Sequence, residues 1–142
     1  MLIKNVQLNA IKAERYMDLS NRPKHVRIDH NSNISRMERV TDTQARVEFQ
    51  YTTSYGPLGV IKLDGTLILE DENAEKIVEG WNNNRKLPNE VAGGIHTAIM
   101  HACVPMAVGI AKDLLLPPPI PLPQLRISKT TPHKTQMGPE VA

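Results

Sequence analysis

Residues 91–111 decide the fold: they read VAGGIHTAIMHACVPMAVGIA, and no side chain among them carries a formal charge. Apolar and small residues follow helical spacing here in two neighbouring rows. The first row is Ile95, Ile99, Ala102, Met106 and Ile110, and the second is Met100, Cys103, Ala107, Ala111 and Leu114. A helix that is apolar on more than one side needs cover on more than one side. We expect one cover from the chain's own sheet and a second from another copy of the chain.

The length of this run also fits a membrane span. His96, Thr97 and His101 weaken that interpretation, as do the alanines and glycines, because small and polar residues contribute little to insertion. The sequence therefore favours a buried helix without membrane insertion.

Composition indicates one folded domain, residues 1–125, followed by a flexible polar tail, residues 126–142. Of the 17 basic and 15 acidic side chains, three basic and one acidic lie in the tail, which leaves 14 of each in the domain. This balance gives no support for nucleic-acid binding. The single cysteine excludes an intrachain disulfide, and the first residues contain no signal-peptide core, so we expect a cytoplasmic protein.

Alternation of apolar and polar residues predicts strands before the long helix. The clearest runs from Ala45 to Tyr55, with Val47, Phe49, Tyr51 and Thr53 on the same face. Residues 2–14 and 60–70 read as further strands, and 25–40 as a strand bent or bulged at NSNIS. We expect residues 25–70 to form an antiparallel meander.

Helical spacing also predicts a short amphipathic helix over residues 73–83, capped by Asp71 or Asn73. Asn89 is the expected cap of the long helix, and Pro105 should kink it near residues 101–105. The predicted fold class is α+β: a four-stranded antiparallel meander sheet with one long kinked helix and one short helix packed on it. After the helix, PPPIPLPQL should be extended, largely as polyproline II, with its apolar side chains projecting from a stiff backbone.

Sites for chemistry are not evident in the sequence. His96 and His101 lie about 140° apart around a helix, and His96 and Cys103 about 10 Å apart along it, so neither pair fits one metal ion. Cys103 should be inert in an apolar setting. Gly93 and Gly94 lie inside the helix, where they suit close approach of another backbone rather than phosphate binding. We expect no catalytic residues, no metal and no cofactor.

The order of these features resembles the SecB-type export chaperones. The resemblance is carried by IKNVQLNAIKAE (residues 3–14), HACVPMAVGIAKDLL (residues 101–115) and LLLPPPIPLPQL (residues 114–125). It implies a SecB-like tetramer, with paired main helices between two sheets, that holds unfolded polypeptides without ATP. Residues 15–24 read as a loop after the first strand, and the resemblance implies that they form the family's crossover loop. It also implies that clients bind the apolar residues of this loop and of the segment after the helix: Tyr16, Met17, Leu19, Leu116, Ile120, Leu122 and Leu125.

Contacts between copies, in a dimer or a tetramer, are expected from the long helix. The residues expected in this interface are Ile95, Ile99, Met100, Cys103, Met106 and Ile110. The sequence departs from the family at Lys62, where an acidic residue is usual, and in its basic tail. Both departures argue against docking on a SecA-type motor.

Three hypotheses about function remain open at this point. The first is an ATP-independent chaperone that binds unfolded or preprotein chains through apolar grooves. The second is a homo-oligomeric scaffold or ligand-binding domain with a SecB-like fold and no chaperone role. The third is a small enzyme with an interfacial site at His96 or His101.

Overall fold

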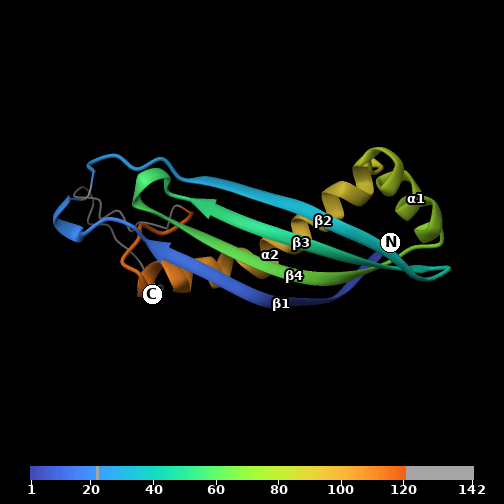
Figure 1. Ribbon diagram of the computed structural model, residues 1–142. Coiled ribbons are helices and arrows are strands. Elements are labelled where there is room, and N and C mark those ends of the chain that lie inside the picture. Colours follow the sequence, from blue (N-terminus) through green and yellow to red (C-terminus); the bar gives the residue numbers. More distant parts are fainter. Residues whose placement is uncertain (22, 121–142) are drawn as a thin grey trace, which may run out of the picture.

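Four antiparallel strands form one sheet in the order β1-β4-β3-β2, and two helices pack on it (Figure 1). The computed structural model describes residues 1–21 and 23–120. The elements are β1 (Leu2–Arg15), β2 (Asp29–Thr41), β3 (Gln44–Ser54), β4 (Gly59–Glu70), α1 (Ala74–Asn84) and α2 (Asn89–Asp113), with short 3₁₀ helices at Leu19–Asn21 and Gly56–Leu58. The predicted α+β class and the meander of β2, β3 and β4 are confirmed.

Strand β3 lies inside the sheet and shows the alternation that the sequence predicts. Its buried face carries Val47, Phe49 and Tyr51, each nearly inaccessible to solvent. Ile61 and Leu63 of β4 lie on the same face. A side-chain period of two puts all of these residues on one side of the sheet, where they form the core.

Edge strands β1 and β2 are less regular. The pairing of β1 with β4 shifts between Lys4 and Gln7, where Asn5 has φ 54°, and again between Leu8 and Ala10. The pairing of β2 with β3 shifts between Ile34 and Arg36, which confirms the bulge expected in NSNIS. Each extra residue moves the following side chains to the other face, so no single alternation describes an edge strand.

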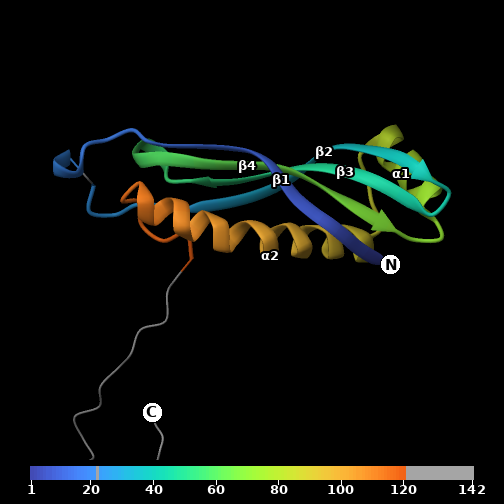
Figure 2. The same cartoon turned by 90° about the horizontal axis from the view of Figure 1, so that it is seen from below.

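Helix α2 runs along one face of the sheet (Figure 2). One row at i, i+4 spacing is buried there: Val91, Ile95, Ile99, Cys103, Ala107 and Ala111. By length and hydropathy α2 could cross a membrane. Its buried row packs on the core of this sheet, as in a core helix.

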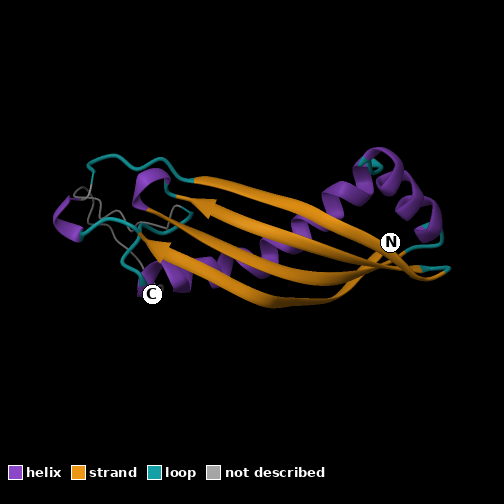
Figure 3. Cartoon of the chain, viewed as in Figure 1, coloured by secondary structure: helices purple, strands orange, loops and turns teal. Residues whose placement is uncertain are grey.

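The start of α2 differs from expectation. Pro88 precedes the helix as its cap, and Asn89 is its first residue, so the prediction of Asn89 as the cap is wrong. A proline has no N–H to satisfy and its fixed φ suits a helix start. Helix α2 is drawn as one continuous helix in Figure 3. Pro105 lies inside it, and its side chain is exposed. The carbonyl left without a partner belongs to His101, on the exposed side, where water can satisfy it.

The short helix α1 confirms the prediction almost to the residue. Ile77, Val78 and Trp81 turn inward against β2 and β3. Asn73 is the cap residue, and the Asp71 side chain accepts a hydrogen bond from the Asn73 N–H at 2.8 Å. Gly94 of α2 makes room for a side chain of the same chain rather than another backbone, since a Cβ added there would lie 2.5 Å from Met1 Cε.

Candidate functional site

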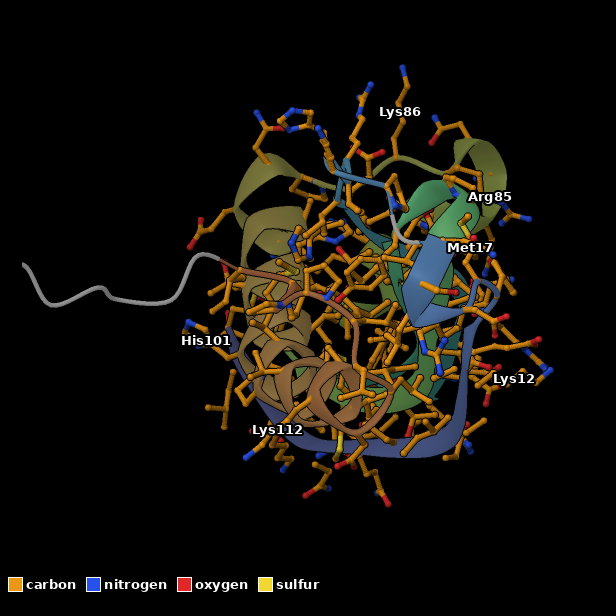
Figure 4. All side chains as sticks on the ribbon, turned by 90° about the vertical axis from the view of Figure 1, so that its left-hand side faces the viewer. Lys12, Met17, Arg85, Lys86, His101 and Lys112 are labelled. Atoms are coloured by element: carbon orange, nitrogen blue, oxygen red, sulfur yellow. The ribbon has the colours of Figure 1, made fainter. Side chains whose placement is uncertain are left out.

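Two segments meet at the end of the sheet opposite α1 (Figure 1). One is the crossover loop, described at residues 16–21 and 23–28, which connects β1 to β2 across the sheet. The other is the exit segment, residues 114–120, which follows α2. Figure 4 looks onto this end, with Met17 labelled in the crossover loop and His101 on the outer side of α2.

Arg15 ties the two segments together. Its Nε donates a hydrogen bond to the Leu114 carbonyl at 2.9 Å, and another guanidinium nitrogen donates to the Met17 carbonyl. The Tyr16 N–H donates to the Leu58 carbonyl at 2.8 Å, which fixes the start of the loop. Hydrogen bonds from a charged donor are stronger than neutral ones, so Arg15 holds both segments in a fixed relation.

The exit segment begins with a tight reversal of the chain. Leu115 adopts the left-handed conformation with φ 59°, and its N–H donates to the Lys112 carbonyl at 3.2 Å. The Leu116 N–H donates to the Ala111 carbonyl at 2.8 Å. These two bonds make a Schellman motif, which satisfies carbonyls left free at a helix end. The reversal turns Leu116 into the core, where it is 5% exposed.

Polar side chains of the sheet hold the prolines that follow. The Tyr55 hydroxyl donates to the Pro117 carbonyl at 2.7 Å. His30 bonds to the Pro119 carbonyl through Nε2 and to the Tyr51 hydroxyl through Nδ1, at 2.8 Å for the second contact. The Thr53 hydroxyl donates to Tyr51 at 2.8 Å. Because a carbonyl can only accept, Nε2 of His30 carries a proton, and the Tyr51 hydroxyl can donate to Nδ1 of the neutral ring.

Burial strengthens the hold of both tyrosines on their protons. It raises the pKa of Tyr55 to about 12 and raises the pKa of Tyr51 above its ordinary value. Tyr55 thus bonds the proline segment directly, whereas Tyr51 bonds His30, which in turn bonds Pro119.

Exposed apolar side chains remain at this end. Tyr16 is 55% exposed, Leu19 is 49% exposed and Ile120 is 36% exposed. Met17 is half-buried against the core. The predicted client-binding role of Leu116 needs correction, because the Schellman turn makes it a core residue. Leu122, Leu125 and the tail lie outside the described residues.

The residues expected between copies divide into two groups. Ile95, Ile99 and Cys103 are fully buried against the chain's own sheet, so they are core residues and not contact residues. The row that faces the sheet combines parts of the two rows predicted from the sequence: Ile95 and Ile99 from the first, and Cys103, Ala107 and Ala111 from the second. Met106 is 43% exposed, and Met100 and Ile110 are half-buried. For these three, contact with a second copy stays a prediction.

The polar residues of α2 form no metal site within the described parts of the chain, where no group of three or more His, Cys, Asp or Glu side chains comes together. His96 is hydrogen-bonded through Nδ1 to the Ser32 hydroxyl, and His101 is exposed. Burial raises the pKa of the Cys103 thiol to about 11, as expected for an inert cysteine.

Sequence reasoning did not single out Arg15, His30, Tyr51 or Tyr55 as functional residues. The two tyrosines carried a usable signal, because a tyrosine on the buried face of a strand needs a partner for its hydroxyl. Arg15 and His30 carried none, because the partner of each in the exit segment is a backbone carbonyl about 90 to 100 residues away.

Comparison with known proteins gives a structural match only. No family model matches the sequence, and no curated protein does. Among solved structures, the chain resembles the Mycobacterium tuberculosis SecB-like chaperone Rv1957 in complex with a ChAD peptide from the Rv1956 HigA1 antitoxin. The TM-score is 0.57 with 12% identity, over 88% of this chain and 89% of the other. The chain therefore has a SecB-like fold.

Proposed function

We propose that this protein is an ATP-independent chaperone that binds unfolded polypeptides at the end formed by the crossover loop and the exit segment. The observation that carries the proposal is the exposure of Tyr16, Leu19 and Ile120 on two segments joined through Arg15. Single exposed apolar residues are common on any protein surface, but several of them on two neighbouring segments at one end of a molecule favour a binding role.

The geometry suits a chain in an extended conformation. Hydrogen bonds to Tyr55 and His30 hold the exit segment in place before any client arrives. A surface that is already ordered avoids part of the entropy cost of binding. The similar Mycobacterium chaperone was solved with a peptide bound, which supports a polypeptide as the ligand of this fold.

We include self-association in the proposal. Met106 and Ile110 lie on one flank of the buried row of α2 and Met100 lies on the other, and all three are only partly covered within the chain. A second copy that packs on the face of α2 away from the sheet and reaches both flanks would remove them from water. The mass of the assembly in solution distinguishes a dimer from a tetramer.

Protein export in the cytoplasm is the narrower form of this proposal. It would require a motor or a membrane partner as well as a client. Lys62 is exposed on β4, on the face of the sheet away from α2, where the family usually presents acidic residues. This charge argues against a SecA-type motor, so the chaperone activity is proposed independently of SecA.

Light scattering from an aggregating, chemically unfolded client tests the proposal. We expect suppression of aggregation at about one oligomer per client chain, without ATP. The double substitution Tyr16→Asp and Leu19→Asp should weaken protection and leave the circular dichroism unchanged, because both side chains are largely exposed. The matched control is Val40→Asp, which places the same charge at a 51% exposed apolar residue at the far end of β2 and should protect like the wild type.

Absence of protection by the wild-type protein would favour the alternative, a homo-oligomeric scaffold or ligand-binding domain without chaperone activity. Equal loss of protection in Val40→Asp would show that the binding surface is not confined to the proposed end.

A further inference from the structure

A second candidate site lies at the opposite end of the molecule, between α1, β2 and the first turns of α2. It is a cavity of about 380 Å³, a size found in small-molecule sites. Its lining consists of Ser32, Asn33, Ile34 and Ser35 of β2, Trp81 and Arg85 from the end of α1, Leu87, and Ala92 and His96 of α2. None of the residues that line it belongs to the proposed client-binding end.

The fixed charge of this lining is positive, and an exposed side chain carries it. Arg85 is the only residue of the lining with a fixed charge, and no aspartate or glutamate is part of it. The ion pairs formed by the described residues do not include Arg85. An anion entering the cavity would therefore meet a cation that no internal carboxylate already neutralises.

Arg85 is held in place by its neighbours. Its guanidinium lies over the Trp81 ring, with Cζ 4.2 Å from the ring centroid, and Nη1 donates to the Trp81 carbonyl at 3.4 Å. Its backbone has φ 59° and closes α1 through an N–H donated to the same carbonyl at 2.8 Å. Glycine is the usual residue at such a helix end, so the side chain present here is not required by the backbone.

His96 brings a second polar group to the cavity. Its Nδ1 is hydrogen-bonded to the Ser32 hydroxyl, and no hydrogen bond among the described residues engages Nε2. When the Ser32 hydroxyl donates to Nδ1, Nε2 of the neutral ring carries the proton and is a free donor. The side chains of Ile34, Trp81, Leu87 and Ala92 supply an apolar wall beside these donors.

We infer that this cavity binds a carboxylate carried on an apolar body, such as an aryl or alkyl acid. The planar guanidinium of Arg85 matches the two oxygens of a carboxylate, and His96 provides a further donor. Ile34, Leu87 and Ala92 cover the apolar body. The source of the carboxylate is either a free small acid or the C-terminus of a polypeptide, and both present the same group.

Tryptophan fluorescence provides a direct measurement, because Trp81 is the single tryptophan of the chain and lines the cavity. Titration with 3-phenylpropionate should give a saturable change in emission that weakens as salt is added. The neutral isostere 3-phenylpropanamide should bind at least about tenfold more weakly, because it lacks the charge-assisted bond to Arg85. Equal binding of acid and amide would overturn the inference.

Arg85→Gly is the decisive variant, because glycine suits the left-handed backbone and the fold should be retained. Binding of 3-phenylpropionate to this variant is followed by the indole N–H signal of Trp81 in NMR spectra. We expect its affinity to fall by about tenfold or more. The matched control is Lys86→Gln, which removes the neighbouring exposed cation that does not line the cavity and should bind like the wild type. Unchanged binding by a folded Arg85→Gly variant would refute the site.

Two peptides separate the sources of the carboxylate. A short peptide that ends in phenylalanine is compared with its C-terminal amide. Binding of the free-acid peptide but not of the amide supports the C-terminus of a polypeptide, and binding of 3-phenylpropionate alone supports a small acid. The variant with Tyr16→Asp and Leu19→Asp should bind 3-phenylpropionate normally, so failure of the chaperone proposal would not affect this one.

Discussion

Burial changes the chemistry of two titratable side chains in the core. It raises the pKa of the Cys103 thiol to about 11 and that of the Tyr55 phenol to about 12. Both groups therefore keep their protons to a higher pH in the folded chain than in the unfolded chain. For Tyr55 the retained proton has a structural use, since the hydroxyl donates to the exit segment. For Cys103 it means low reactivity in the folded state.

The raised pKa of Cys103 predicts loss of stability in alkali. Between pH 9 and pH 11 the unfolded chain, with an ordinary thiol pKa of 9.0, releases its proton while the folded chain keeps it. The free energy of unfolding must therefore fall as pH rises through this window. Guanidinium chloride unfolding at pH 7.5 and pH 10 should show a larger fall for the wild type than for Cys103→Ala. Parallel falls in the two proteins would contradict a buried thiol.

At the scale of elements, the exit segment is fixed by hydrogen bonds that other elements supply. Arg15 ends β1, His30 is the second residue of β2, and Tyr55 follows β3. Polyproline segments form no internal hydrogen bonds, so their carbonyls depend on such donors or on water. The position of Ile120 at the binding end is therefore set by the sheet and not by the prolines alone.

Tyr55→Phe tests this arrangement. Removal of the hydroxyl that donates to Pro117 should lower the free energy of unfolding by about 1 kcal/mol and speed hydrogen exchange at the Leu116 amide. Urea unfolding gives the free energy of unfolding, and NMR gives the rate of hydrogen exchange at the Leu116 amide. Tyr16→Phe is the control, since Tyr16 is exposed and its hydroxyl makes no hydrogen bond within the described residues. The same loss in both variants would mean that the Pro117 contact contributes nothing specific.

Prediction from sequence succeeded for elements whose periodicity is uninterrupted. β3 alternates without a break, because it pairs on both sides and lies over the core. In β1 the positive φ of Asn5 and two shifts in pairing break the alternation, and these depend on the partner strand. The row of α2 that faces the sheet could not be chosen from the sequence either, because apolar residues lie on several sides of that helix.

At the scale of the whole molecule, the single chain covers only one side of α2. Ile95, Ile99 and Cys103 are enclosed, whereas Met106 is 43% exposed. The sheet can cover only the side that faces it. The expected second copy thus remains an inference from the flanking residues, and the mass in solution is its test.

Met106→Asp should reduce self-association. A charge placed in an apolar contact between copies would lose its hydration without gaining a partner. We expect a lower mass by multi-angle light scattering and unchanged circular dichroism, since the side chain projects from the core. Val40→Asp, at an exposed residue of β2 away from α2, should keep the wild-type mass. A wild-type protein that is already monomeric would contradict the prediction of an oligomer.

The sequence by itself determined the elements and their order, because the period of apolar residues follows from local backbone geometry. It also placed Tyr16, Met17 and Leu19 in a loop and stopped the long helix before its prolines. Only the tertiary structure decided that Leu116 joins the core, that Arg15, His30 and Tyr55 hold the exit segment, and that Trp81, Arg85 and His96 line one cavity. These contacts join residues far apart in the chain, and no local pattern records which distant groups the sheet brings together.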